Sequence, residues 1–141
     1  MLKNIPSLLS PDLLKIIMEM GHGDELVIGD GNFPASSCAK RLVRLDGYGV
    51  CEILTALLKF FPLDVSSENF ILMERMDCDL CKDVSIWKEY EKIGKNGNSG
   101  FKKLTFLERF EFYERSKKAY AILATGEEAI YANIILKKGI C

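Results

Sequence analysis

His22 is the only histidine of the chain and stands in Met20-Gly21-His22-Gly23-Asp24-Glu25, with a glycine on each side. Glycines add no side-chain bulk and tolerate unusual dihedral angles, so a ligand can approach the imidazole. An imidazole exchanges a proton near neutral pH, because its unperturbed pKa is about 6.5. The residue types predict either a general acid or base here, or a helix-end histidine that bonds a carbonyl of the last turn.

Asp30 is a second candidate for chemistry, because it directly follows the apolar run Leu26-Val27-Ile28 and Gly29. Such a run predicts a strand buried on both faces. In sheets built from alternating strands and helices, ligands bind at the carboxyl ends of the strands. Asp30 is therefore placed for a polar ligand, and its negative charge argues against phosphate binding by the adjacent glycines.

Cys78 and Cys81 form a C-x-x-C pair, which can be half of a zinc site or a redox pair. Zinc needs two further ligands, and the chain offers one histidine and otherwise scattered cysteines. We therefore expect two free thiols near a loop and no bound metal. The odd total of five cysteines suits the reducing cytosol, where we expect the protein to stay.

The segment RFEFYERSKK, Arg109 to Lys118, has two interpretations. One is a solvated helix with ion pairs such as Glu111 with Arg115 and Glu114 with Lys117 or Lys118. The other is a sugar-binding surface, because arginine offers a rigid fork of donors and an aromatic ring covers apolar C–H groups. No phosphate loop, dinucleotide fingerprint or serine-hydrolase motif is present.

The elements that position these residues follow from apolar periodicity and turn residues. A first helix begins after Ser10, its N-cap, with Pro11 at the first position, and ends at Gly21. Further helices are expected at 51–61, 84–93 and 107–119, strands at 25–29, 43–45, 70–76, 120–124 and 132–137, and a flexible connection at 94–100. This alternation predicts an α/β fold, a single three-layer domain over 1–141 whose central sheet is largely parallel and flanked by helices.

Length and charge fit one small domain that handles a neutral ligand. The 141 residues can bury a core without disulfides or metals, and the net charge of −1 gives no attraction to nucleic acid or to a membrane surface. No apolar run reaches the roughly 20 residues that span a bilayer, and the N-terminus does not resemble a signal peptide.

The sequence resembles the fucose mutarotase and ribose pyranase family over nearly its whole length. The resemblance lies in MGHGDELVIGDGNFPASS, RLDGYGV, KFFPLD, ERFEFYERSKKAYAILATGE and YANIILKKG. The order and spacing match the fucose branch. The segment 76–104, which holds the C-x-x-C pair, is the least constrained part.

The resemblance implies a role for each matched residue. His22 matches the family's proton donor, and Asp30 and Arg109 match sugar-binding residues, the arginine being a histidine in the ribose branch. Tyr131 and Asn133 match the Tyr-Gly-Asn that reaches the sugar, and Met73 is a further expected contact. Ala132 replaces the glycine, a mild change if its side chain points away from the ligand.

Asp64 and Tyr120 match positions that some family members use as further acid or base groups. From residue type alone, the alternative for Asp64 is a carboxylate in a helix-to-strand loop, and the alternative for Tyr120 is a strand aromatic in the core.

The implied activity is the interconversion of the α and β anomers of fucose by general acid–base ring opening and closure, without a cofactor. The implied assembly is a closed homo-oligomeric ring, with ten copies in bacterial members and sites near subunit contacts. Three alternatives stay open at this stage: a ribose pyranase of the same family, a non-catalytic monosaccharide-binding module, and a thiol-redox or zinc protein.

Overall fold

The computed structural model describes residues 2–97 and 100–141. The helices are α1 (Pro11–Glu19), α2 (Ala35–Cys38), α3 (Val50–Leu57), α4 (Ile86–Gly97) and α5 (Arg109–Lys118), with a 3₁₀ turn η1 (Asp77–Asp79). The strands are β1 (Glu25–Gly29), β2 (Leu42–Leu45), β3 (Phe70–Met73), β4 (Leu104–Leu107), β5 (Ala121–Thr125) and β6 (Ile134–Lys137). No helix among these residues is long and apolar enough to cross a membrane.

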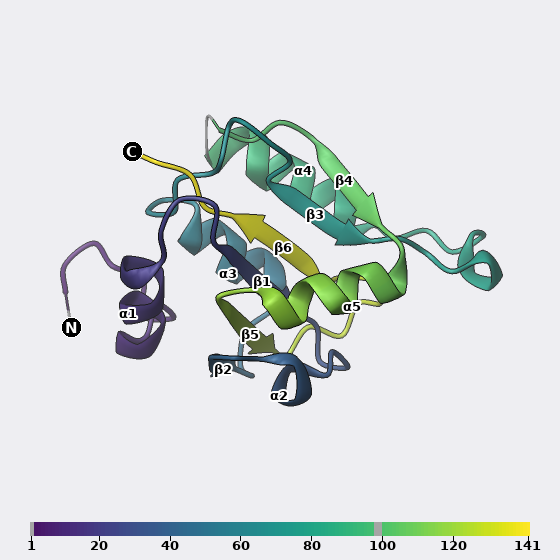
Figure 1. The fold of residues 1–141 in the computed structure, drawn as a ribbon, viewed down its shortest axis with the longest axis horizontal. Coiled ribbons are helices and arrows are strands. Elements are labelled where there is room, and N and C mark those ends of the chain that lie inside the picture. Colours follow the sequence, from purple (N-terminus) through teal and green to yellow (C-terminus); the bar gives the residue numbers. More distant parts are fainter. Residues whose placement is uncertain (1, 98–99) are drawn as a thin grey trace.

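The six strands form one sheet in the order β2-β5-β1-β6-β3-β4. Strand β6 runs antiparallel to its neighbours β1 and β3, and the other pairs are parallel. The sheet lies between α3 and α4 on one face and α5 on the other, so the predicted three-layer α/β fold with a largely parallel sheet is confirmed (Figure 1).

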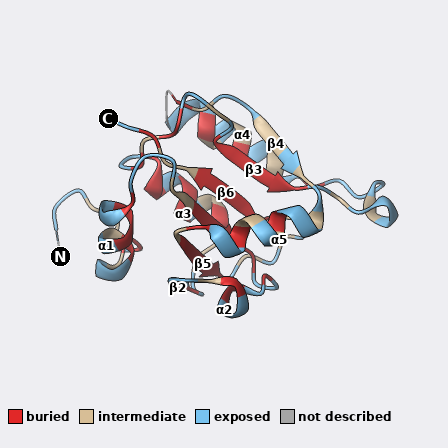
Figure 2. Ribbon diagram, in the orientation of Figure 1, coloured by how far each residue is buried: buried red, intermediate tan, exposed pale blue. Residues whose placement is uncertain are grey.

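The central strands are buried on both faces, because their side chains alternate between two apolar clusters. In β1, Leu26 and Ile28 pack with residues of α3, whereas Val27 packs with Phe112 of α5. The sheet is accordingly the most deeply buried layer, with helices exposed on their outer sides (Figure 2). Period-two alternation inside a continuous apolar run is the pattern of a sheet covered on both faces.

The helix termini follow the expected capping chemistry. Ser10 Oγ accepts the Leu13 amide at 3.2 Å and caps α1. Glu108 caps α5 by accepting the amides of Phe110 and Glu111. The predicted Glu114–Lys117 pair is present at 2.6 Å.

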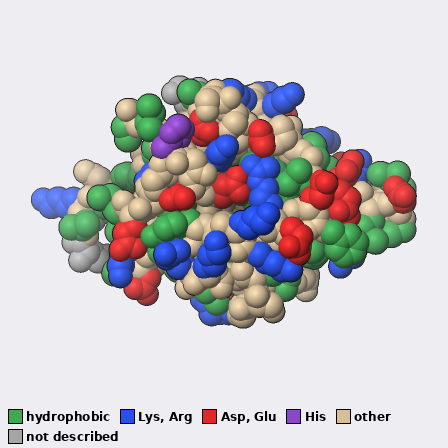
Figure 3. All heavy atoms as spheres, in the orientation of Figure 1, with side chains coloured by type: hydrophobic (Ala, Val, Ile, Leu, Met, Phe, Trp, Pro, Cys, Tyr) green, Lys and Arg blue, Asp and Glu red, His purple; other side chains and the backbone are tan. Residues whose placement is uncertain are grey.

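The predicted partner of Arg115 was wrong. Arg115 binds Glu25 of β1 through two nitrogens and reaches Glu68, instead of pairing with Glu111. The bidentate bond joins α5 to the start of β1. Elsewhere on this face, charges of both signs are mixed (Figure 3).

Several predicted boundaries were also wrong. Strand β4 was missed because it is a short edge strand with partly exposed residues, and α5 starts after it rather than at Leu107. The predicted flexible connection at 94–100 is helical up to Gly97, and residues 98 and 99 lie outside the described residues. Gly94 serves close packing instead of a turn, because a Cβ there would overlap the Phe101 ring. Strand β3 ends at Met73, β6 begins at Ile134, and the short helix α2 was not predicted.

The turn that follows β5 ties together the loops at the carboxyl end of the sheet. Glu127 accepts the amide of Val50 through its carboxylate and the amide of Gly31 through its carbonyl. The Thr125 hydroxyl donates to the Gly29 carbonyl at 2.8 Å. The loop that carries Asp30 is therefore fixed from the neighbouring strand.

Replacing Gly126 by alanine tests this turn. A Cβ on Gly126 would overlap the carbonyl oxygen of Asp46, so the turn must shift. We expect Gly126→Ala to lower the free energy of unfolding by about 1–3 kcal/mol, the usual cost of overpacking. Gly47→Ala is the matched control, because no atom lies within 4 Å of its added Cβ. Urea unfolding at one protein concentration compares them, and equal stability of the two variants would contradict the account.

Candidate active site

A pocket of about 230 Å³ opens at the carboxyl end of the parallel strands. It is smaller than the roughly 300–1,000 Å³ of pockets for drug-sized ligands, which suits a small polar molecule. Its walls include five residues predicted from the sequence: Asp30, Met73, Arg109, Tyr131 and Asn133. The structure thus brings together residues that lie up to 103 positions apart. A larger hollow of about 420 Å³ at the N-terminal segment lacks titratable side chains among its lining residues.

Asp30 is buried at the end of β1 and is held by backbone contacts. Its amide donates to Asn133 Oδ1 at 2.8 Å, and its Oδ1 accepts the Asn32 amide at 3.0 Å. Burial raises the pKa of Asp30 above its ordinary value, and hydrogen bonds from neighbouring amides oppose the shift. A desolvated carboxylate in a pocket is a strong acceptor for a ligand hydroxyl.

Tyr131 sits in the connection between β5 and β6 with a left-handed backbone, φ 57°. This conformation is uncommon outside glycine and costs free energy, so neighbouring contacts must hold it. The Trp87 Nε1 donates to the Tyr131 carbonyl at 2.9 Å. Ala132 is fully buried and is not among the residues that line the pocket.

Arg109 is the first residue of α5, and one helical turn later Tyr113 lines the same pocket. The guanidinium carbon lies 5.7 Å from the centre of the Tyr113 ring. Sequence reasoning did not single out Tyr113 as a site residue. Its spacing of four from Arg109 was the available signal, because residues four apart share a face of a helix.

His22 and Asp64 lie together at the opposite end of the sheet. His22 Nε2 is 3.6 Å from Asp64 Oδ1, and the imidazole is 56% exposed whereas the Asp64 side chain is 5% exposed. Hydrogen bonds from the hydroxyls of Ser66 and Ser67 hold the pKa of Asp64 well below its usual range. Asp64 is therefore a fixed negative charge that faces the imidazole.

Tyr120 also lies at this end, immediately before β5, and not in the pocket. Its hydroxyl donates to Glu19 at 3.2 Å, and the Arg41 guanidinium stacks on its ring at 4.0 Å. Tyr120 is partly buried and packs against the core, and it does not line the pocket that contains Asp30.

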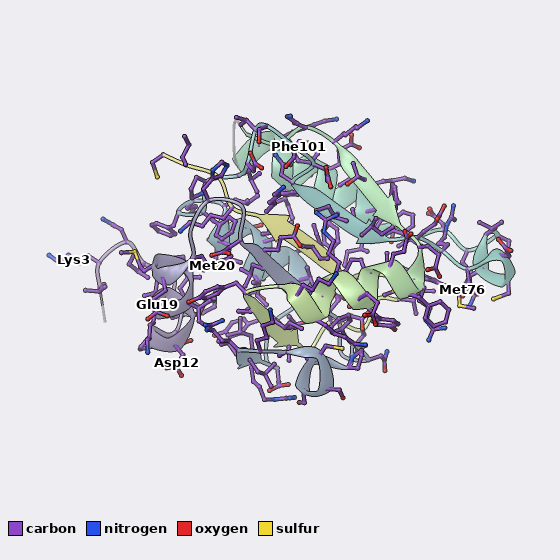
Figure 4. The ribbon with its side chains drawn as sticks, viewed as in Figure 1. Lys3, Asp12, Glu19, Met20, Met76 and Phe101 are labelled. Carbon is purple, nitrogen blue, oxygen red and sulfur yellow. The ribbon has the colours of Figure 1, made fainter. Side chains whose placement is uncertain are left out.

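The two groups of predicted residues are held apart by β1 itself. His22 precedes this five-residue strand and Asp30 follows it. At about 3.3 Å per strand residue, the two residues are on the order of 15 Å apart. Figure 4 shows Glu19 and Met20, which precede His22 in the sequence, well apart from Met76, which lines the pocket.

The cysteines form no site in the described part of the chain. Cys78 and Cys81 are exposed free thiols, as predicted, and no cluster of histidine, cysteine and acidic side chains there is suited to a metal ion.

Comparisons with known proteins identify the family of this chain. The model of a family described as the RbsD / FucU transport protein family matches residues 3–141. The fucose mutarotase of Danio rerio is 49% identical, covering 99% of this chain and 94% of its own. The crystal structure of the fucose mutarotase from Streptococcus pneumoniae in complex with L-fucose has a TM-score of 0.92 and 48% identity, covering 99% of both chains.

A more distant structure is RbsD of Bacillus subtilis complexed with D-ribose, with a TM-score of 0.76 and 24% identity over 100% of this chain and 99% of that one. At this identity the likeness shows the fold alone. Taken together, the full-length family match and the close relatives place this chain in the RbsD / FucU family.

Proposed function

We propose that this protein is a fucose mutarotase, an isomerase that interconverts the α and β anomers of L-fucose. The observation that carries the proposal is the pocket in which Asp30, Arg109, Tyr131 and Asn133 converge. A relative with 48% identity over nearly the full chain was crystallised with L-fucose, which supports the choice of sugar. The five free cysteines suit an enzyme of the cytosol.

Anomer exchange needs a proton on the ring oxygen and the removal of another from the anomeric hydroxyl. The ring then opens to the aldehyde, the carbonyl face turns, and the ring closes again. General acid–base groups near neutral pKa accelerate such steps by on the order of 10²- to 10⁴-fold each. No covalent intermediate is required.

In the proposed mechanism, the pocket residues hold the sugar and His22 moves the proton. Asp30 accepts hydrogen bonds from sugar hydroxyls, and Arg109 and Asn133 complete the polar frame. Tyr131 covers part of the ring. Asp64 stays ionised and lies 3.6 Å from His22 Nε2, so we assign it to orienting the imidazole rather than to exchanging protons.

The complete site is proposed to form between two copies of the chain. His22 and Asp30 cannot contact one sugar within one copy, because β1 keeps them apart. If a neighbouring copy places its His22 over this pocket, the proton carrier and the sugar-binding residues come together in one site. A closed ring satisfies this arrangement for every copy at once, since each contributes one surface of each kind.

The ribose pyranase alternative is less favoured. Arg109 lines the pocket, whereas the ribose branch of the family is expected to carry a histidine at this position. A sugar-binding module without turnover stays the second alternative. Exchange measured on L-fucose, D-galactose and D-ribose separates these three functions. A fucose mutarotase accelerates anomer exchange of L-fucose, a ribose pyranase acts on D-ribose, and a binding module accelerates neither.

The variant His22→Ala tests the assignment of the proton carrier. We expect catalysed exchange of L-fucose anomers to fall by at least about 100-fold, the usual contribution of one acid–base group, while the fold survives because the imidazole is exposed. Saturation-transfer NMR on the anomeric protons gives the rate. Lys59→Ala, a change at another exposed position, serves as the control. Unchanged exchange in His22→Ala would refute the assignment.

Mixing two inactive variants tests the shared site. His22→Ala and Asp30→Asn each remove one half, so neither pure assembly retains intact sites. When the two chains are unfolded and reassembled together at equal amounts, roughly a quarter of the sites combine both intact halves. We expect exchange to recover to about that fraction of the wild-type rate. If the mixture stays as inactive as the separate variants, the two halves do not meet between chains.

A further inference from the structure

One wall of the pocket comes from the loop that joins β3 to α4, the segment least constrained by the family resemblance. Met76, Asp79 and Lys82 of this loop line the pocket. Figure 1 shows the loop extending from the sheet beyond the carboxyl ends of β3 and β4. None of these three residues has a role in the mechanism described above.

Asp79 is bound directly to a residue of the sugar pocket. The Tyr131 hydroxyl donates a hydrogen bond to Asp79 Oδ2 at 2.6 Å. The same oxygen of Tyr131 accepts the Met76 amide at 3.2 Å. Two contacts from one loop therefore fix the direction of the phenol.

The carboxylate of Asp79 is itself fixed by the loop. Lys82 Nζ lies 2.8 Å from Asp79 Oδ1, so the lysine and the tyrosine hold opposite oxygens of the carboxylate. Arg75 donates to the carbonyls of Leu80 and Lys82 and closes the loop on itself. The two bonds to the Asp79 carboxylate, at 2.8 and 2.6 Å, are short and charge-assisted, the stronger class of hydrogen bond in proteins.

We propose that Asp79, held by Lys82, is a positioning residue. It accepts the hydrogen bond that the Tyr131 hydroxyl donates, so this phenol can only accept a hydrogen bond from the sugar. The proposal deepens the proposed function and rests on it. The phenolic oxygen donates to Asp79 and accepts from Met76, which leaves one lone pair for a hydroxyl of the sugar. Tyr131 then selects a sugar that presents a donor at this point of the ring.

The protonation states agree with this arrangement. Burial, together with the bond to Asp79, raises the pKa of Tyr131, and the bonds from Lys82 and Tyr131 lower the pKa of Asp79. The phenol is therefore neutral and the carboxylate ionised around neutral pH. This is the state in which the hydrogen bond has the stated direction.

The variant Asp79→Ala tests the proposal through anomer-exchange kinetics on L-fucose. We expect KM to rise on the order of tenfold with kcat changed by less than about threefold, because the loss falls on sugar binding. Asp77→Ala is the matched control, an exposed carboxylate in the same η1 turn outside the pocket, and should leave both parameters near wild type. Asp79→Asn keeps an acceptor oxygen and should recover part of the loss.

A double-mutant cycle with Tyr131→Phe decides whether Asp79 acts through the tyrosine. If it does, Asp79→Ala combined with Tyr131→Phe is no worse than Tyr131→Phe alone, since the phenol that Asp79 positions is already gone. Additive losses would overturn the proposal, as would equal effects of Asp79→Ala and Asp77→Ala.

An NMR titration of ring-labelled tyrosine gives a readout without catalysis. The pKa of Tyr131 should fall in Asp79→Ala and stay the same in Asp77→Ala, and an unchanged value in both would refute the contact. The wild-type protein separates the two claims. If the wild-type protein does not accelerate anomer exchange, the proposed function is wrong. If the wild type accelerates exchange and Asp79→Ala has the same kinetic parameters, only the positioning role of Asp79 is refuted.

Discussion

The length of one buried strand governs the organisation of this protein. Strand β1 lies in the middle of the sheet, bonded to β5 on one side and β6 on the other, and its three central residues are fully buried. A strand packed on both faces and both edges can neither shorten nor bend to bring its ends together. His22 before it, the proposed acid–base residue, and Asp30 after it, the proposed sugar-binding carboxylate, are therefore held at fixed, separate places. A chemistry that needs both has to draw them from two molecules.

The two ends of the sheet also differ in electrostatics, because each holds a carboxylate in a different environment. Asp30 is desolvated and its pKa is raised, whereas Asp64 is surrounded by hydroxyl donors and its pKa is lowered. Two carboxylates whose environments push their pKa values apart serve different roles. In the proposed mechanism, Asp30 meets the hydroxyls of a neutral ligand, and Asp64 orients the adjacent imidazole of His22.

Sequence patterns predicted the layers, the buried strands and most helix starts, because apolar periodicity and capping residues act locally. They failed where tertiary contacts decide. Arg115 pairs across to Glu25 instead of along its own helix, and Gly94 serves packing against Phe101 instead of a turn. For the site, the resemblance identified the residues around Asp30, but the distance between His22 and Asp30 needed the sheet topology. Tyr113 and Asp79 escaped notice, since only the fold shows that they meet Arg109 and Tyr131 in one pocket.

A crystal structure of the assembled protein with L-fucose bound tests the central claim most directly. The decisive quantity is the distance from the His22 imidazole to the ring oxygen and anomeric hydroxyl of the sugar. The account predicts that the sugar is held by Asp30 and Asn133 of one chain, with the imidazole of a neighbouring chain within about 3.2 Å of one of these oxygens. A sugar bound in this pocket with every His22 remote from it would contradict the account.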